Sequence, residues 1–364
     1  MTHPIEFSHS LKKKFSRVSE FFKPTQLGSF NFPSILVQAP MAGICSVPYR
    51  LLMEELGAGF TISELISCHV INHGNERTLN MLKLHEREDK VGLQLFGEDP
   101  QAMAQAAKVM ESYKPRFIDI NMGCPVRKVV TKGGGSALLQ KPEELRVFFS
   151  TIKDAIKIPL TIKIRTGWDE EQINADQVIE IAKECEIEWV AIHGRTRAQQ
   201  YTGLADWDYL EGLIEKSPLP IIGNGDLHTP IQTSKRMDST KCQALMIARG
   251  SIRNPFIYFE SYIEKHQELQ DIQFTGSDYC EIINRLFFYT QENFSHERTR
   301  LVQMRKFVAW FAAGFPGAAK FRSEVFQSRE YDELIKTSDR YFSALSSRAS
   351  KQIPDEKFMN SGHG

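Results

Sequence analysis

The chain has 364 residues, and its 45 Lys and Arg residues balance its 45 Asp and Glu residues. This length predicts about two domains, or one large α/β domain with an appendage. The balanced charge excludes a global basic field, so nucleic acid could contact only a local patch. No run of about 18 apolar residues predicts a membrane-spanning helix, and the polar N-terminus lacks the apolar segment of a secretory signal.

The six cysteines are widely spaced, and none belongs to a CxxC pair. We therefore expect no zinc site, no iron–sulfur site and no other bound metal. Scattered, reduced thiols favour an enzyme of the cytoplasm. The cysteines are Cys45, Cys68, Cys124, Cys185, Cys242 and Cys280.

Residues 1–30 are predicted to be a polar extension, with basic residues at Lys12 to Lys14 and at Arg17. Between residues 31 and 265, short apolar runs alternate with stretches in which apolar residues recur every three or four positions. The eight runs are Ile35–Ala39, Phe60–Ser63, Val91–Phe96, Phe117–Ile120, Leu160–Ile164, Trp189–Ile192, Pro220–Ile222 and Ala244–Ala248.

Eight strands that alternate with helices predict parallel pairing, and eight is the number that closes a (β/α)8 TIM barrel. Helical stretches between them include Pro100–Ser112, Pro142–Ile156, Ala175–Cys185 and Trp207–Glu215. A doubly wound open sheet is the alternative. The first strand-to-helix turn, Pro40-Met41-Ala42-Gly43, argues against it because it is not a GxGxxG fingerprint.

The alternation stops after residue 265, and residues 270–350 show only helical patterns. Aromatic residues recur there at helical spacing, which favours the core of an all-helical C-terminal domain over a stacking platform. The break Gly314-Phe315-Pro316-Gly317 separates two of its helices. Residues 351–364 are predicted to be a loose tail.

The stretch FIDINMGCPVRKVVTKGGGS (117–136) contains the most informative strand end. Gly123 and Pro125 stop the strand, so Asn121 and Cys124 are expected at its C-terminal tip. In parallel α/β proteins that tip is where ligands bind. A buried, inert thiol is the alternative for Cys124 taken alone.

Nearly every other predicted strand also ends in polar or glycine residues, as a site at a barrel mouth requires. Glycines at the seventh and eighth tips, with Arg249, predict a phosphate site. Lys163 would point into the barrel and could stabilise an electron-accepting ring, or could form an internal salt bridge. His193 could equally be a satisfied core histidine. The tip residues are Pro40, Met41, Ala42, Gln94, Lys163, His193, Arg195, Asn224, Gly225, Asp226, Ala248, Arg249 and Gly250.

Long stretches resemble the tRNA-dihydrouridine synthases, flavoenzymes that reduce a uridine in tRNA, and the bacterial DusB-like branch matches best. The stretches follow the family's order over about residues 35–325. They are APMAG (39–43), PYR (48–50), QLFGEDP (94–100), DINMGCPVRKVV (119–130), GGGSALL (133–139), KIRTGWD (163–169), HGRTRAQQYTGLADW (193–207), IIGNGDL (221–227), RGSIRNPFIY (249–258) and AAGFPGAAKFR (312–322).

The resemblance implies a barrel that binds FMN, a helical domain that contacts tRNA, and NADPH or NADH as the reductant. Hydride would pass from flavin N5 to C6 of the uridine, and Cys124 would donate a proton to C5. Asn121 and Arg195 would lie near the uracil. The implied flavin contacts are Pro40, Met41, Ala42, Gln94, Lys163 and His193. The implied phosphate and ribityl contacts are Asn224, Gly225, Asp226, Ala248, Arg249 and Gly250.

One departure concerns the first tip, where Cys45 and Ser46 stand in place of the family's usual threonine and aspartate. Phosphate contacts are expected from basic residues of the helical domain, above all Arg305, Lys320 and Arg322, although each could belong to a solvated helix face. We expect a monomer.

Two other functions stay open on the sequence. One is an FMN-dependent reductase of a free pyrimidine, similar to dihydroorotate dehydrogenases. The other is a non-catalytic tRNA-binding module. A metal-dependent hydrolase is disfavoured, because the tips carry no carboxylate–histidine ligand set.

Overall fold

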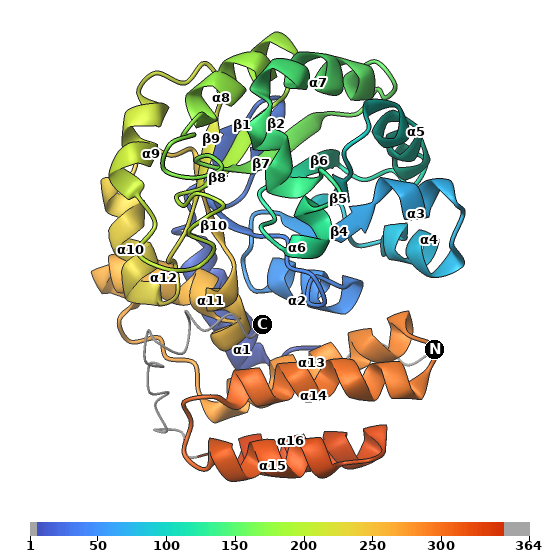
Figure 1. Ribbon diagram of the computed structural model, residues 1–364. Coiled ribbons are helices and arrows are strands. Elements are labelled where there is room, and N and C mark those ends of the chain that lie inside the picture. Colours follow the sequence, from blue (N-terminus) through green and yellow to red (C-terminus); the bar gives the residue numbers. More distant parts are fainter. Residues whose placement is uncertain (1–5, 346–364) are drawn as a thin grey trace.

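The computed structural model describes residues 6–345, and Figure 1 shows a barrel beside a layered group of helices. Eight parallel strands follow the order β3-β10-β9-β8-β7-β6-β5-β4. Backbone hydrogen bonds from Gln38 N to Phe60 O (3.0 Å) and from Gly59 N to Leu36 O (2.8 Å) join the two ends of this sheet. The predicted barrel is thus confirmed, and the open-sheet alternative is excluded.

The strands coincide with the apolar runs of the sequence, and their side chains are almost entirely buried. Buried parallel strands favour apolar residues on both faces, as in Ala244–Ile247, whereas polar residues alternate with apolar ones in Phe117–Met122 and Leu160–Arg165. The strands are β3 Leu36–Gln38, β4 Thr61–Ser67, β5 Val91–Phe96, β6 Phe117–Met122, β7 Leu160–Arg165, β8 Val190–His193, β9 Ile221–Asn224 and β10 Ala244–Ile247.

Amphipathic helices cover the outside of the barrel. In α5, for example, the Asp99 carboxylate accepts a hydrogen bond from Ala102 N, and Met103 and Met110 are buried. The barrel helices are α2 Val47–Glu55, α3 Cys68–Asn72, α4 Glu76–Leu82, α5 Pro100–Glu111, α6 Arg127–Val130, α7 Leu145–Lys153, α8 Ala175–Glu184, α9 Trp207–Ile214, α10 Pro230–Ser239, α11 Arg249–Arg253 and α12 Ile257–Lys265. Short 3-10 helices are η1 Gly135–Gln140, η2 Pro142–Glu144 and η3 Gln267–Leu269.

The N-terminal residues contain more structure than the polar extension expected from the sequence. A hairpin of β1 Thr25–Leu27 and β2 Phe30–Phe32 covers the N-terminal end of the barrel. Its two phenylalanines pack against aromatic residues at the starts of barrel strands, among them Trp189. Each strand has only three residues, too few to give a periodic signal.

Helix α1 His9–Ser19 precedes this hairpin and packs beside the segment that follows the barrel. The Phe15 ring stacks on Phe259 of α12, with ring centroids 4.6 Å apart. Lys14 pairs with Asp278 at 2.7 Å, and Arg17 pairs with Asp271 at 2.7 Å. Lys14 and Arg17 thus attach α1 to the start of α13 and to the segment that precedes it.

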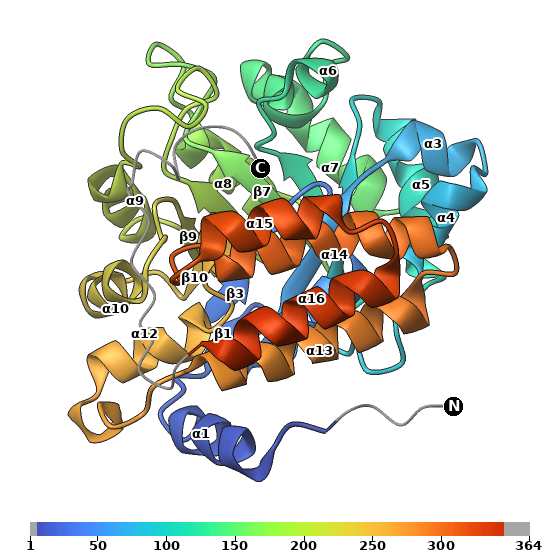
Figure 2. The same ribbon diagram turned by 90° about the horizontal axis from the view of Figure 1, so that it is seen from below.

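Four helices form the C-terminal bundle: α13 Gly276–Asn293, α14 Glu297–Ala312, α15 Ala318–Gln327 and α16 Tyr331–Ala344. Helices α13 and α14 lie against the barrel near α2 and α11, and α15 and α16 form the outer layer (Figures 1 and 2). Phe307, Phe311 and Phe315 are buried, as expected for a helical core. The predicted tail, 351–364, lies outside the described residues.

Candidate active site at the C-terminal end of the barrel

A chain of buried hydrogen bonds links three neighbouring strands at the barrel mouth. The Asn121 amide donates to Gln94 Oε1, and the Gln94 amide donates to Asp119 Oδ2, each over 2.8 Å. Thr161 Oγ1 completes the chain by donating to Asp119 Oδ1 at 2.7 Å. Burial raises the pKa of Asp119 to about 6. The polar groups at these tips are therefore fixed against one another.

Cys124 follows the tip of β6 and is half-buried. Its backbone N–H donates to Asn121 Oδ1 at 3.0 Å, and its carbonyl accepts from the Ser136 hydroxyl at 2.9 Å. Burial raises the pKa of the thiol, although Arg165 and Lys163 oppose that effect. The thiol is consequently protonated near neutral pH, which suits a proton donor better than a nucleophile.

Gly135 makes the tight return past this cysteine possible. Its φ is +61°, in the left-handed region, and a Cβ there would lie 2.9 Å from Cys124 O. A larger residue would therefore strain the backbone and push on the cysteine.

Lys163 lies on β7, in register with Asn121 on β6. Among the described residues, the hydrogen-bond partner of its Nζ is Asn224 Oδ1 at 3.2 Å, rather than a carboxylate. The Asn224 amide in turn donates to Met246 O at 2.7 Å. Burial and the neighbouring Arg165 lower the pKa of Lys163 to about 8. A buried ammonium with only an amide oxygen beside it is suited to an anionic ligand.

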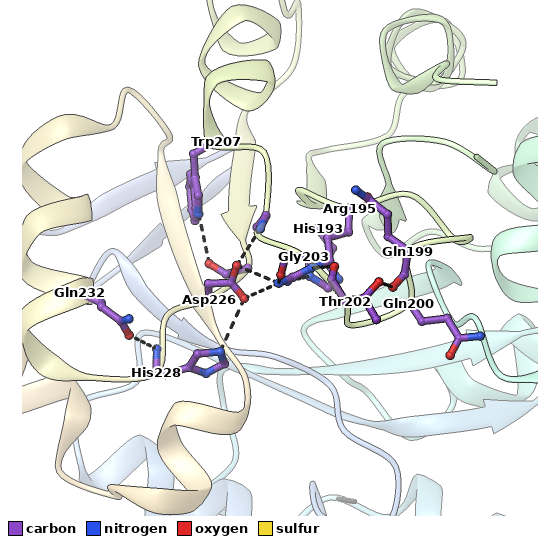
Figure 3. Close-up of polar contacts among 12 residues, drawn as sticks. His193, Arg195, Gln199, Gln200, Thr202, Gly203, Trp207, Asp226, His228 and Gln232 are labelled. Carbon is purple, nitrogen blue, oxygen red and sulfur yellow. Dashed lines mark hydrogen bonds and ion pairs between the residues drawn. The ribbon is translucent and has the colours of Figure 1, made fainter. Parts of the chain in front are cut away.

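His193, Arg195 and Asp226 form a second network (Figure 3). Burial and the surrounding cations hold the pKa of His193 well below its usual value, so its ring is neutral. The His193 Nε2 lies 3.2 Å from the Arg195 Nη1. The fully buried Arg195 side chain donates to Asp226 Oδ2 at 2.9 Å. Burial alone would raise the pKa of Asp226, but hydrogen bonds from His228, Ala205 N–H and Arg195 lower it to about 2.

Arg165 and Arg195 together hold the loop that follows β8. Arg195 donates to Thr202 O at 3.1 Å and to Gly203 O at 2.6 Å. Arg165 donates to Gln200 O at 2.8 Å, and also to Thr196 O and Gly123 O. The anchoring role of Arg165 was missed from the sequence, because its partners are backbone carbonyls that carry no sequence signal.

Two glycines shape the seventh and eighth tips. Gly225 has φ +135°, and a Cβ there would lie 2.4 Å from the Ala205 Cβ. A Cβ at Gly250 would lie 2.4 Å from Leu227 O. Arg249 stands between these tips and the Tyr201 ring, with its guanidinium carbon 5.0 Å from the ring centroid. Closely packed backbone beside a cation is an arrangement that can bind an anion.

At the first tip, Pro40 and Met41 are half-buried and Ala42 is exposed. Ala248, at the eighth, is also half-buried. Cys45 is fully buried, donates to Ala39 O at 3.3 Å, and has its pKa raised by burial to about 12. It is therefore not a second reactive thiol at the mouth.

The basic residues predicted to contact RNA lie on the bundle rather than at the tips. Arg305, on α14, donates to Ser328 O, whereas Lys320 and Arg322, on α15, are exposed. A cavity of about 510 Å³ on this side of the bundle is lined by Glu297, Arg298, Leu301, Val302, Arg305 and Arg329.

The mouth fits a flavin on its own chemistry. Four cations converge there, Lys163, Arg165, Arg195 and Arg249, and they lower the pKa of the neutral His193. A ring that becomes anionic on reduction and a phosphate group would both be favoured beside them.

In the described part of the chain no cluster of three metal-ligating residues occurs, and none of its helices could cross a membrane.

Solved structures with the same fold are enzymes built on this barrel. Histamine dehydrogenase from Rhizobium sp. 4-9 superposes with a TM-score of 0.53 and 15% identity over 75% of this chain and 51% of that one. A 2-naphthoyl-CoA reductase gives the same TM-score and identity over 67% of this chain and 52% of that one. Fold and site together define a (β/α)8 barrel whose cationic mouth is suited to a flavin and its phosphate.

The particular family follows from the sequence comparisons. The model described as "Dihydrouridine synthase (Dus)" matches residues 37–347. tRNA-dihydrouridine synthase B of Pasteurella multocida is 33% identical over 88% of this chain and 96% of its own length. The Escherichia coli K12 protein of the same name is 32% identical over 87% and 98%. The chain belongs to the dihydrouridine synthase family, as its motifs predicted.

Proposed function

We propose that this chain is a tRNA-dihydrouridine synthase that reduces the C5=C6 bond of uridines in tRNA, with FMN as cofactor and NADPH as reductant. Its family and its similarity to the bacterial B-type synthases support this function. The observation that carries it is the half-buried thiol of Cys124, which follows the end of β6 and lies near Lys163 of the neighbouring strand β7. The proposed setting is the cytoplasm, where tRNA is found, and the proposed state is a monomer.

The flavin would be held by residues from nearly all tips, and when bound it supplies the hydride that adds to C6. Lys163 would stabilise negative charge on the ring, since its own cation has no carboxylate partner at hydrogen-bond distance. Gly225, Gly250 and Arg249 would admit and neutralise the phosphate. The complete proposed set is Pro40, Met41, Ala42, Gln94, Lys163, His193, Asn224, Gly225, Asp226, Ala248, Arg249 and Gly250.

Within this set, we propose that some residues position their neighbours in addition to lining the flavin site. Asp226 uses its carboxylate on Arg195 and Ala205 N–H, so it orders the β8 loop behind the cofactor. Gln94 is engaged by Asn121 and Asp119 and holds the amide chain in place. Only groups with remaining hydrogen-bond capacity can serve a ligand directly.

Cys124 would deliver its proton to C5 of the uracil. Asn121 supports it by accepting a hydrogen bond from the Cys124 backbone N–H, which fixes the start of the following loop. Arg195, expected near the uracil, is engaged with Asp226 and with the loop carbonyls. We therefore propose that both residues shape the uracil pocket, Asn121 from β6 and Arg195 through the loop.

The uridine must leave its stack to reach this thiol, because C5 and C6 are inaccessible inside a folded RNA. The bundle, proposed to span residues 270–350 beside a barrel of residues 31–265, would hold the tRNA while this happens. Arg305, Lys320 and Arg322 would contact phosphates. A free-pyrimidine reductase would have no use for these four additional helices.

The test is to map dihydrouridine in tRNA from a strain that lacks this gene and from the same strain carrying the wild-type gene. Loss of dihydrouridine at defined positions, restored by the gene, is expected. An unchanged map, combined with turnover of free uracil or dihydroorotate by the purified yellow protein, would establish the free-pyrimidine function instead. A colourless protein that still binds tRNA would indicate a binding module.

A further inference from the structure

One contact joins the C-terminal bundle directly to the loop at the first strand tip. Lys306 Nζ, on α14, donates to the carbonyl oxygen of Gly43 at 2.8 Å. Gly43 ends the Pro40–Gly43 turn that follows β3. Lys306 is half-buried in this position, and that burial lowers its pKa. The Lys306 side chain is therefore directed at the barrel.

The other backbone group of Gly43 is held from the barrel side. Its N–H donates to the Glu64 carboxylate. The pairing of β4 with β5 shifts between Ile62 and Leu65, so Glu64 lies in a β-bulge. Bulges redirect side chains near sites, and here the bulge coincides with the residue that reaches Gly43. Gly43 is thus held by opposite charges at its N–H and at its C=O, which belong to the two successive peptide groups on either side of its Cα.

The backbone conformation of residue 43 explains why it is a glycine. Its φ is +73°, a left-handed conformation that favours glycine, and a Cβ there would meet no atom within 4 Å. The position needs glycine for its conformation, not for space. The turn is closed by Cys45 N, which donates to Met41 O at 3.1 Å.

The neighbouring residue on α14 keeps Lys306 in place. The Phe307 ring stacks on Tyr49 of α2, with centroids 5.1 Å apart and an interplanar angle of 11°. The Tyr49 hydroxyl lies 2.9 Å from Ser251 Oγ, beside the eighth tip. Helix α14 is therefore seated on the barrel at one end of the mouth, which is the condition for Lys306 to hold a fixed position.

We propose that Glu64 and Lys306 are positioning residues of the cofactor site, which clamp Gly43 and thereby hold the Pro40–Ala42 turn against the flavin. This inference rests on the proposed function, because it takes the mouth to be a flavin site. It also assigns the bundle a second task, since a helix expected to dock RNA completes the cofactor pocket. In this role Lys306 is not a phosphate contact.

The first experiment measures FMN affinity of the apoprotein by fluorescence quenching. Lys306→Met and Glu64→Gln are each expected to weaken binding about fivefold to tenfold, and Lys306→Arg to keep most of it. The double variant should lose little more than either single one, because the two groups hold the same residue, Gly43. Lys336→Met, an exposed lysine on α16, is the matched control and should bind FMN as the wild type does.

The second experiment separates this role from RNA contact. If Lys306 contacts phosphate, Lys306→Met will lower the slope of log affinity for tRNA against log salt by about one and leave FMN affinity unchanged. The proposed role predicts that Lys306→Met weakens FMN binding and leaves the salt slope for tRNA unchanged. Unchanged FMN affinity in this variant would overturn the proposed role. Lys306→Met should also speed hydrogen exchange at the Gly43 amide, and unchanged exchange in both variants would likewise refute the clamp.

Exchange at Gly43 is measured without any cofactor, so it tests the clamp even if the proposed function is wrong. A wild-type protein that binds no flavin would overturn the proposed function. A flavin-binding wild type whose Lys306→Met and Glu64→Gln variants match it would overturn only the clamp.

Discussion

The barrel mouth and the helical bundle use charge in opposite ways. At the mouth, Arg165 and Arg195 are buried, and each donates to several fixed acceptors. On the bundle, Lys320 and Arg322 are exposed on one helix. Buried, fully hydrogen-bonded charges fix a geometry, whereas exposed ones add a weak, salt-sensitive attraction. We propose that this difference separates a region for chemistry from a region for docking RNA, and substitutions in the two should have effects of different size and kind.

The largest effect is expected at Cys124. Cys124→Ala should lower the rate of uridine reduction about 100-fold to 10,000-fold, because the proton donor at C5 is lost. Flavin content and tRNA affinity should stay at wild-type values. Cys280→Ala, which removes a half-buried thiol of the bundle, is the control. Single-turnover reduction of tRNA measures the effect, and a rate within a few-fold of wild type would remove Cys124 from its proposed role.

The next effect concerns the network behind the mouth. Asp226→Asn should destabilise the protein by about 3 kcal/mol, because it leaves Arg195 buried without its carboxylate. The low pKa of Asp226, about 2 against 3.8, means that this contribution is complete above pH 3.8 and is lost as the pH falls toward 2. Urea unfolding measures it. Asp238→Asn, at an exposed ion pair with Lys265, should cost less than about 1 kcal/mol, and an equal cost at both sites would contradict the comparison.

A pH titration sharpens the role of Lys163. Its pKa of about 8 predicts that FMN affinity falls as the pH rises above 8, because the cation is lost. Stability of the apoprotein should change in the opposite direction. The unfolded lysine, with a pKa of 10.5, holds its proton longer, so stability rises between pH 8 and 10.5. Lys163→Met should abolish both trends. FMN affinity that is flat across this range in the wild type would show that the cation does not face the flavin.

On the bundle, the expected effects are smaller and depend on salt. Lys320→Ala and Arg322→Ala should each weaken tRNA binding and lower the slope of log affinity against log salt by about one. Flavin affinity should not change. Lys336→Ala serves as the control on α16. Filter binding at several salt concentrations measures the slopes, and unchanged slopes would place the RNA elsewhere.

The smallest effect is expected at the N-terminal helix. Lys14→Met should cost about 1 kcal/mol in stability, because Lys14 is partly buried against Asp278, whose side chain is only 5% exposed. Lys12→Met removes an exposed partner of Glu6 and should cost less than about 0.5 kcal/mol. Thermal unfolding compares the two, and equal costs would show that α1 is not anchored by this pair.

The sequence alone predicted the barrel strands well, because buried parallel strands such as β10 leave short runs of apolar residues. It also predicted which residues stand at the tips, since parallel strands place their ends on one rim. It could not show how those residues pair. Arg165 and Arg195 bind loop carbonyls, and Glu64 reaches Gly43 through a bulge, and these contacts depend on loop conformation rather than residue type. The sequence did not predict the β1–β2 hairpin for a different reason, because each of its strands has only three residues.

The most direct test incubates the purified, flavin-loaded protein with NADPH and unmodified tRNA, then maps the product by mass spectrometry. We predict that defined uridines gain two hydrogens, and that the Cys124→Ala protein, equally yellow and equally reducible by NADPH, leaves them unchanged. A wild-type protein whose flavin is reduced by NADPH but whose tRNA keeps every uridine intact would contradict the central claim.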